Sequence, residues 1–194
     1  MPSEYLAQTL LLFAKMIVME NKKENQMVNI MHQMDKEMDT MQLTKDIDHD
    51  FSAMMIAHHK VAIDIANIIV KEGKDDDLKE MAQIMIDKQK LEIGQFQEFL
   101  KSSFPHKPNE ARHRQLMEVM ENMSSQADQL LLRGNLEKDF VTLMLTHHRS
   151  AIDMANIEIG AGNQAAVKEL ADEIIKDQEA EVEKLKQWLA DHKQ

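Results

Sequence analysis

Two short stretches of the sequence repeat the same potential metal ligands at the same spacing. The pattern is Met-x-x-His-His, and its six residues are Met55, His58, His59, Met144, His147 and His148. Side chains three and four positions apart lie on one face of an α-helix, so each thioether meets two imidazoles. Burying an imidazole without a partner costs roughly 1–3 kcal/mol. Four inward-facing histidines therefore need hydrogen bonds, water or a metal ion.

The sulfur ligand narrows the choice of metal. Thioether sulfur selects Cu(I), or Ag(I) as its mimic, whereas Mg, Ca and Mn prefer oxygen ligands. The chain contains no Cys, so a thiolate site is excluded. Imidazole binds metal in its neutral form, so we expect affinity to fall as the pH drops below about 6.5. A single buried histidine is more often a hydrogen-bonded core residue than a ligand, and that interpretation stays open for each of the four.

The repeat extends well beyond these two stretches. Shifting the sequence by 89 positions superimposes identical residues from 50–68 onto 139–157, and the register continues downstream without a gap. Further pairs in this register include Gly73 with Gly162, Gln89 with Gln178, and Glu92 with Glu181. Self-similarity at one offset indicates a duplicated supersecondary unit.

Helix signals divide each repeat into segments. We expect helices over 3–43, with a break near 21–25, then 46–72, about 75–102, 110–132, 136–159 and 163–192. Gly73 suits a helix C-cap, and the acidic residues 75–77 suit a helix start. Residues 104–109 carry two prolines and form a linker, and Asn109 is a potential N-cap.

Short connections within each repeat predict antiparallel helical hairpins. Two such hairpins can bury their apolar faces against each other as a four-helix bundle. The predicted fold is all-α: one helical domain over 1–194, with repeats at about 27–103 and 110–192. The two remaining helices would flank this pseudo-symmetric bundle.

Composition limits the partners. The chain has 23 basic and 34 acidic residues, a net charge of −11, which argues against nucleic acid or an anionic membrane. Residues 5–19 are apolar but short and interrupted, so we predict neither a membrane span nor a signal peptide there. Hydrolase and nucleotide motifs are not evident.

The 17 methionines form further patterns. Met27, Met31, Met34, Met38 and Met41 recur every three or four residues, as do methionines in 117–123. One interpretation is core or partner-facing packing. The other is a set of weaker, more open Cu(I) sites, whose candidate residues are Met31, Met34, His32, His113, Met120 and Met123. Met54 and Met154, beside the inner faces, fit either interpretation.

The string D-F-x-x-x-M-x-x-H-H-x-x-A-I-D-x-A-N, followed by Q-x-x-E-[IV], resembles a bacterial family of ferritin-like, copper-binding domains long classed as a domain of unknown function. The matches are 50–67 with 89–93 and 139–156 with 178–182, and the similarity covers roughly 46–190. This resemblance implies exported four-helix bundles that bind Cu(I) or Ag(I) through Met and His and contribute to copper tolerance. It supports the six residues named first as ligands.

The resemblance also carries implications beyond the ligands. It implies a periplasmic or cell-envelope location. We separately predict a non-enzymatic role, with other copper-handling proteins or a second copy of the chain as candidate partners. Two positions depart from the family's pattern. Many relatives have Met where this chain has Phe96 and Leu185, and Glu158 occupies the position equivalent to Ile69.

Two other functions remain open. A ferritin-like di-iron or di-manganese oxidoreductase would use carboxylates in the bundle core. Glu92 and Glu181 favour it, but the one Glu-x-x-His string, Glu110 to His113, stands alone beside the linker. A metal-free structural or adaptor bundle could instead dock partner helices on its Met-rich faces.

Overall fold

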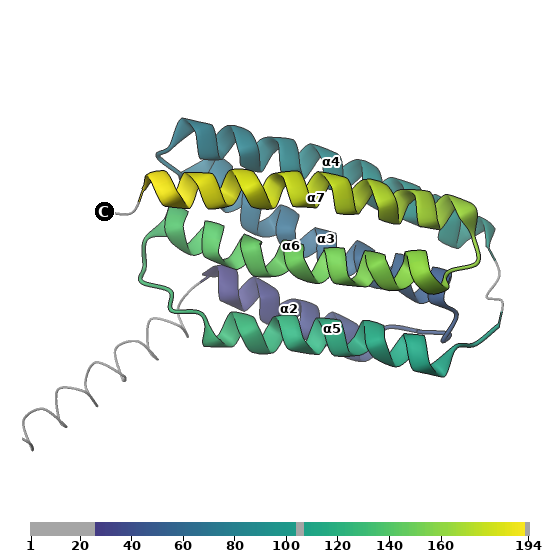
Figure 1. Cartoon of the computed structure of the whole chain (residues 1–194). Coiled ribbons are helices and arrows are strands. Elements are labelled where there is room, and N and C mark those ends of the chain that lie inside the picture. Colours follow the sequence, from purple (N-terminus) through teal and green to yellow (C-terminus); the bar gives the residue numbers. More distant parts are fainter. Residues whose placement is uncertain (1–25, 104–106, 193–194) are drawn as a thin grey trace, which may run out of the picture.

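The computed structural model describes residues 26–103 and 107–192, which form helices and no strands (Figure 1). The helices are α2 (Gln26–Thr40), α3 (Ile47–Glu72), α4 (Asp76–Ser102), α5 (Glu110–Gln129), α6 (Leu136–Ala161) and α7 (Ala165–Asp191). The predicted all-α fold is confirmed. The expected helix and its break within 3–25 lie outside the described residues, as does the apolar stretch 5–19.

Side-chain caps set most of the helix starts. Asp75 accepts a hydrogen bond from the Leu78 amide, and Asn109 accepts one from the Arg112 amide. Asp46 and Asn135, one repeat offset apart, cap α3 and α6 in the same way. Each cap satisfies a backbone donor that has no partner within its own helix.

Glycine ends α3 and α6, but not for the reason that the sequence suggests. Gly73 follows α3 with a φ of −65°, so it is not the left-handed cap that a helix-ending glycine usually provides. A Cβ there would lie 2.6 Å from the Ile69 carbonyl oxygen, and one on Gly162 would lie 2.8 Å from the Glu158 carbonyl oxygen. Close approach of the backbone, rather than φ, requires glycine at both ends.

The prediction for α5 was too long. The helix ends at Gln129 instead of residue 132, and the Leu130 amide bonds to the Ala127 carbonyl. Leu132 is buried, so the chain leaves the helix to place this side chain in the core. Tertiary packing thus outweighs local helix propensity.

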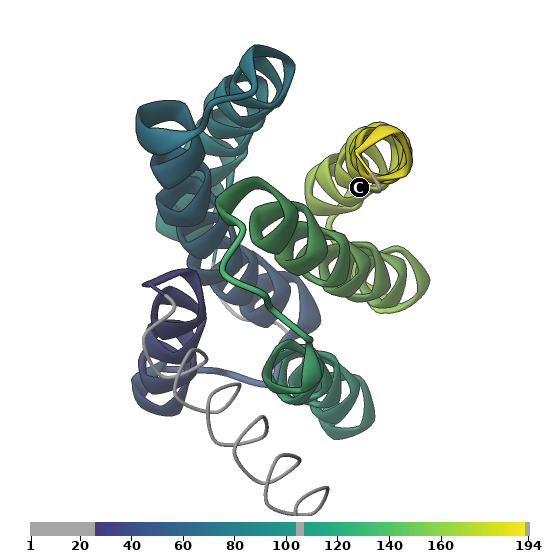
Figure 2. The same cartoon turned by 90° about the vertical axis from the view of Figure 1, so that its left-hand side faces the viewer.

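The helices form a four-helix bundle with two flanking helices. Helices α3 and α6 pack against each other at the centre, α4 covers α3, and α7 covers α6. On the opposite side α2 packs on α3 and α5 packs on α6, so Figure 2 shows three pairs of helices in end view. Along α3 the polar residues Lys60, Asp64 and Asn67 are exposed, and the face that carries Met55, His58 and His59 is buried.

Reciprocal caps join the two hairpins. The Asp48 carboxylate in α3 accepts hydrogen bonds from the Asn163 and Gln164 amides, just before α7. The Glu137 carboxylate in α6 accepts one from the Lys74 amide, just before α4. Both donor and acceptor positions follow the offset of 89. Each repeat therefore secures the start of the last helix in the other, as pseudo-two-fold symmetry requires.

Among the described helices, α3 alone is long and apolar enough to cross a membrane by length and composition. In this structure 72% of that apolar stretch is buried inside the bundle. Its apolar character is accounted for by packing against α2, α4 and α6.

Candidate metal centre

Four imidazoles form a row across the centre of the bundle. His58 and His59 come from α3, His147 and His148 come from α6, and all four side chains are fully buried. The ring centroids of His58 and His147 are 3.6 Å apart, and each lies 6.1 Å from the histidine next to it in sequence. The order across the bundle is therefore His59, His58, His147, His148. The sequence brings these residues to one face of each helix, and the α3–α6 contact joins the two faces.

A carboxylate from an outer helix contacts each end of the row. Glu92 Oε2 in α4 lies 2.7 Å from His59 Nε2, and Glu181 Oε2 in α7 lies 2.9 Å from His148 Nε2. Both distances are short enough for a polar contact, although the nitrogen–oxygen approaches lack hydrogen-bond alignment. Carboxylates in this position orient an imidazole and raise its basicity as a ligand.

The two inner histidines bond across the α3–α6 interface. His147 Nε2 lies 3.1 Å from the His58 carbonyl oxygen, which can only accept, so this nitrogen carries the proton. His58 Nε2 lies 2.8 Å from Ser150 Oγ, and the Ser150 hydroxyl is 2.7 Å from the His147 carbonyl oxygen that it donates to. The carbonyl contact therefore assigns the proton of the His147 ring to Nε2.

The other ring nitrogen of each histidine has no protein partner. Nδ1 of His58, His59, His147 and His148 is buried and makes no hydrogen bond within the described residues. Buried polar atoms are nearly always bonded, so four unbonded ring nitrogens in one row need an explanation. Unprotonated Nδ1 is a metal-binding lone pair, and a Cu(I)-type ion is what these atoms would accept.

Burial also sets the charge of the inner pair. Desolvation, followed by the neighbouring histidines, lowers the pKa of His58 and His147 well below the usual 6.5. A backbone hydrogen bond opposes this shift only in part. Both imidazoles are therefore neutral at pH 7, which is the form that binds metal.

The expected sulfur ligands lie one helical turn before the histidines. Met55 and Met144 are fully buried on the same helices. The described residues hold no group of three or more His, Asp and Glu side chains arranged to bind a metal ion. A centre in this row thus needs another donor, and the thioethers of Met55 and Met144, one turn before the histidines, are the candidates.

The weaker candidates divide into two groups. Met31, Met34, Met54, Met120, Met123 and Met154 are all buried. Burial agrees with the packing interpretation, because α2 and α5 pack on α3 and α6 and turn the flanking methionines inward. Met123 reaches the centre itself, with its sulfur 2.9 Å from Ser150 Oγ.

His32 and His113, by contrast, lie away from the imidazole row. His32 Nε2 is 2.9 Å from Asp128 Oδ1, and His113 Nδ1 is 2.8 Å from Asp50 Oδ2. The row's own ring contacts and hydrogen bonds include neither of them. The structure thus places Met123 at the centre. His32 instead pairs with Asp128 of α5, and His113 pairs with Asp50 of α3.

Three features of the centre were not assigned from the sequence. Ser150 has Val61 at the equivalent position of the first repeat, so the repeat did not reveal it. Gln89 and Gln178 are buried one turn before the glutamates, with both amide atoms unbonded. Glu92 and Glu181 are 89 positions apart, as are His59 and His148. This shared offset could have indicated that each glutamate contacts a histidine.

Glu158, the departure noted in the sequence, is fully buried. Burial, followed by the negative charge of Asp48, raises its pKa to about 9, so it is neutral at pH 7. The other departure, Phe96, fills core space by packing edge-to-face on Phe51 at a centroid distance of 5.6 Å. Neither residue adds a soft ligand.

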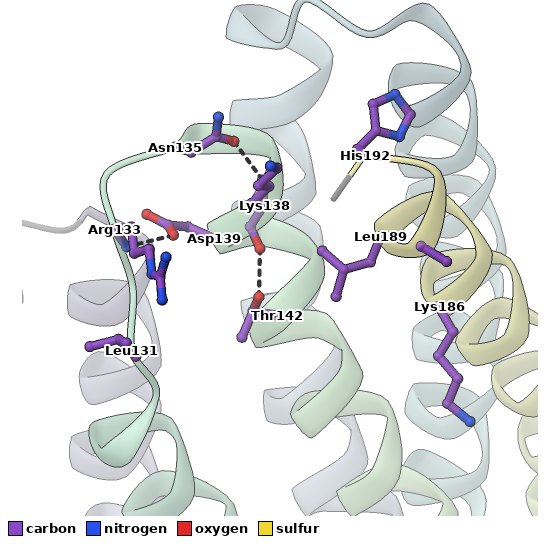
Figure 3. Close-up of a pocket in the computed structure, with 10 residues that line it drawn as sticks. Leu131, Arg133, Asn135, Lys138, Asp139, Thr142, Lys186, Leu189 and His192 are labelled. Carbon is purple, nitrogen blue, oxygen red and sulfur yellow. Dashed lines mark hydrogen bonds between the residues drawn. The ribbon is translucent and has the colours of Figure 1, made fainter. Parts of the chain in front are cut away.

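A separate pocket of about 720 Å³ opens at the end of the bundle. Figure 3 shows it between the turn before α6 and the C-terminal end of α7, with Leu131 and Arg133 on one side and Leu189 and His192 on the other. Its lining contains none of the row histidines and no methionine. The candidate centre is therefore not this pocket but the buried row.

The fold and the row together define a class: ferritin-like helical bundles with a duplicated, histidine-containing core. The model of the family described as "Domain of unknown function (DUF305)" matches the chain twice, over residues 8–100 and 101–189. The chain belongs to this family. No curated protein matches its sequence.

Solved structures of the same fold agree with this assignment. CopM in an Ag-bound form is 27% identical, with a TM-score of 0.58 over 78% of this chain and 98% of CopM. CopM in the Cu(I)-bound form is 26% identical, with a TM-score of 0.56 over 77% and 98%. A DUF305 fragment from Deinococcus radiodurans is 22% identical, with a TM-score of 0.56 over 74% and 95%, and shows the shared fold alone.

Proposed function

We propose that this protein binds Cu(I), or Ag(I) in its place, through Met and His side chains, for copper sequestration, transfer or tolerance. The observation that carries the proposal is the row of four buried Nδ1 atoms without partners. The ligands are the imidazoles of His58, His59, His147 and His148 and the thioethers of Met55 and Met144.

The residues fit a soft monovalent ion. Thioether and neutral imidazole are ligands that Cu(I) accepts, and the six side chains are fully buried, which disfavours a strongly hydrated cation. The low pKa of His58 and His147 keeps both neutral, so we expect affinity to persist somewhat below pH 6.5 before protons compete. CopM, 26–27% identical, has been solved with Cu(I) and with Ag bound.

A di-iron or di-manganese enzyme is the second candidate, favoured by the two Glu–His contacts in the core. Such centres need several carboxylates around each metal pair. Here one glutamate meets one histidine at each end, and the described residues form no carboxylate-rich cluster. A non-catalytic, metal-binding role accords better with this arrangement.

Anaerobic titration with Cu(I) and with Fe(II) tests the proposal. We expect tight Cu(I) binding that weakens in the variant carrying Met55→Leu and Met144→Leu, because Leu fills the same space without sulfur. Met117→Leu, in the flanking helix α5, is the matched control and should bind as the wild type does. Tight Fe(II) binding that survives both core substitutions would contradict the proposal.

The cellular setting is part of the same proposal. We place the protein in the periplasm or cell envelope, where it would exchange copper with other copper-handling proteins, as a monomer or a homo-oligomer. Cell fractionation with an antibody tests the location. Recovery in the cytoplasmic fraction alone would contradict it.

A further inference from the structure

The imidazole row is sealed from solvent except at its ends. All four histidines, Met55 and Met144 have no exposed surface. The side chains of Glu92 and Glu181, which contact the outer histidines, are 11% and 14% exposed. A metal ion that reaches the row without unfolding the bundle must therefore pass these carboxylates.

One of these carboxylates lines a small hollow between α4 and α7. The hollow encloses about 40 Å³, and its lining includes Met81, Met85, Lys88, Asp177 and Glu181. That volume holds one water molecule or a metal ion, since a water molecule occupies about 30 Å³ in the liquid. Glu181 thus contacts the hollow and His148 at the same time.

The lining suits a soft cation. Met81 is half-buried and Met85 is buried, and the two lie one helical turn apart on α4. Their thioethers would bind Cu(I) or Ag(I) weakly, and the Glu181 carboxylate adds negative charge beside them. Leu170 and Ile174 occupy the equivalent positions of α7, so the thioethers lie on one side only.

An ion pair between the two helices lies one turn from the glutamates. Lys88 Nζ is 2.7 Å from Asp177 Oδ1, and each residue is four positions before the glutamate of its own helix. Hydrogen bonding to Asp177, followed by the charges of Asp177, Glu181 and Glu92, raises the pKa of Lys88. Lys88 therefore places a positive charge near both exposed carboxylates.

We infer that the hollow between α4 and α7 is the route by which Cu(I) or Ag(I) enters and leaves the imidazole row. The thioethers of Met81 and Met85 take the ion from solvent, and Glu181 passes it to His148. The Lys88–Asp177 pair slows this passage by bridging the helices and by repelling the cation. This inference rests on the proposed function, since it supplies a path to the same site.

Entry and exit rates of silver separate a route from a ligand. A residue that lies on the route alone changes both rates by the same factor and leaves affinity unchanged, whereas a ligand, or a residue such as Glu181 that also contacts a ligand, changes affinity. The full chain is mixed with Ag(I) nitrate in chloride-free buffer, quenched with thiosulfate after set times, and assayed for bound silver. The loaded protein is then challenged with thiosulfate and sampled in the same way.

We expect the variant carrying Met81→Leu and Met85→Leu to load and release silver about tenfold more slowly, equivalent to about 1.4 kcal/mol in the barrier. Lys88→Gln should load and release it several-fold faster. The matched controls are Met117→Leu and Lys60→Gln, which removes the α2–α3 ion pair Lys60–Glu37. Both should behave as the wild type does.

Three results would overturn the inference: unchanged rates in both route variants, a change in one direction of transfer only, or the same change in the controls. Lys88→Gln alters a half-exposed side chain, so it tests the route even if the methionine variant fails to fold. A wild-type protein that takes up no silver at equilibrium would instead overturn the proposed function.

Discussion

The two hairpins of this protein share their candidate metal ligands and differ in the packing around them. Both place Met-x-x-His-His on the central helix and a glutamate against the outer histidine. They differ at Ile69 and Glu158, one turn or more from the row, and at the turns before the central helices. The comparison indicates that the two repeats retain the same methionine, histidines and glutamate at the imidazole row, whereas the residues that surround the row differ.

The largest expected effect comes from giving the first hairpin the buried acid of the second. Ile69 is fully buried, so Ile69→Glu buries a carboxyl group without a partner, and we expect a loss of about 3 kcal/mol in the free energy of unfolding. Denaturant unfolding measures it. Leu91→Glu, at a position 71% exposed, is the control and should change stability by less than about 0.5 kcal/mol. Equal stability of Ile69→Glu and wild type would show that the hairpins tolerate the same residue.

Removing the charge of each glutamate compares the two halves of the centre directly. Glu92→Gln and Glu181→Gln should each lower Cu(I) affinity about 10–100-fold, because the partner of a ligating histidine is weakened. Competition against a chromophoric Cu(I) chelator measures this. Glu80→Gln, on the surface of α4, is the control. A loss confined to one variant would assign the metal to a single hairpin.

The buried acid of the second hairpin predicts a pH dependence that the first lacks. In the folded protein the pKa of Glu158 is about 9, against 4.5 for an unfolded chain. Its contribution to stability is therefore full below pH 4.5 and is lost as the pH rises towards 9. Glu158→Gln, which cannot ionise, should be more stable than wild type at pH 8 and should lose this advantage near pH 4.5. An equal difference in the free energy of unfolding between Glu158→Gln and wild type at both pH values would contradict the raised pKa of Glu158.

The smallest effects concern the turns before the central helices. Lys45 and Gly134, equivalent in the two repeats, both have a positive φ, at 67° and 76°. Gly134→Ala should cost about 1 kcal/mol, because Ala is strained in this conformation. Lys45→Gly should stabilise the protein by up to about 1 kcal/mol, because glycine adopts this positive φ without strain. The Lys45–Glu110 ion pair that it removes is exposed and contributes little. Thermal unfolding measures both changes in stability. If both substitutions stabilised the protein, or both destabilised it, the two turns would not be equivalent.

The sequence predicted those parts of the fold that depend on local patterns. The offset of 89, the caps at Asp75 and Asn109 and the inner faces of α3 and α6 all follow from residue type and spacing. Contacts between the repeats could not be predicted in this way. Asp48 caps α7 from 115 residues away, and nothing near Asp48 in the sequence indicates its partner.

The candidate centre likewise has some features that local sequence patterns predict and others that depend on contacts between the repeats. The four histidines were recognised because a helix places them on one face, and their burial agrees with that prediction. The order of the rings and the tautomers depend on how α3 meets α6, which includes Ser150, present in one repeat only. For the methionines of α2 the sequence left core packing and more open metal sites as alternatives, because their spacing alone does not show that α2 packs on α3.

Copper stoichiometry tests the central claim most directly. The protein is loaded with Cu(I) under anaerobic conditions, desalted and assayed for copper by elemental analysis, beside a variant with His58, His59, His147 and His148 all changed to Asn. Circular dichroism checks that the variant is folded. We predict that the wild type retains copper and that the folded variant retains none at the centre. Equal copper in the two proteins would contradict the assignment of the imidazole row as the binding site.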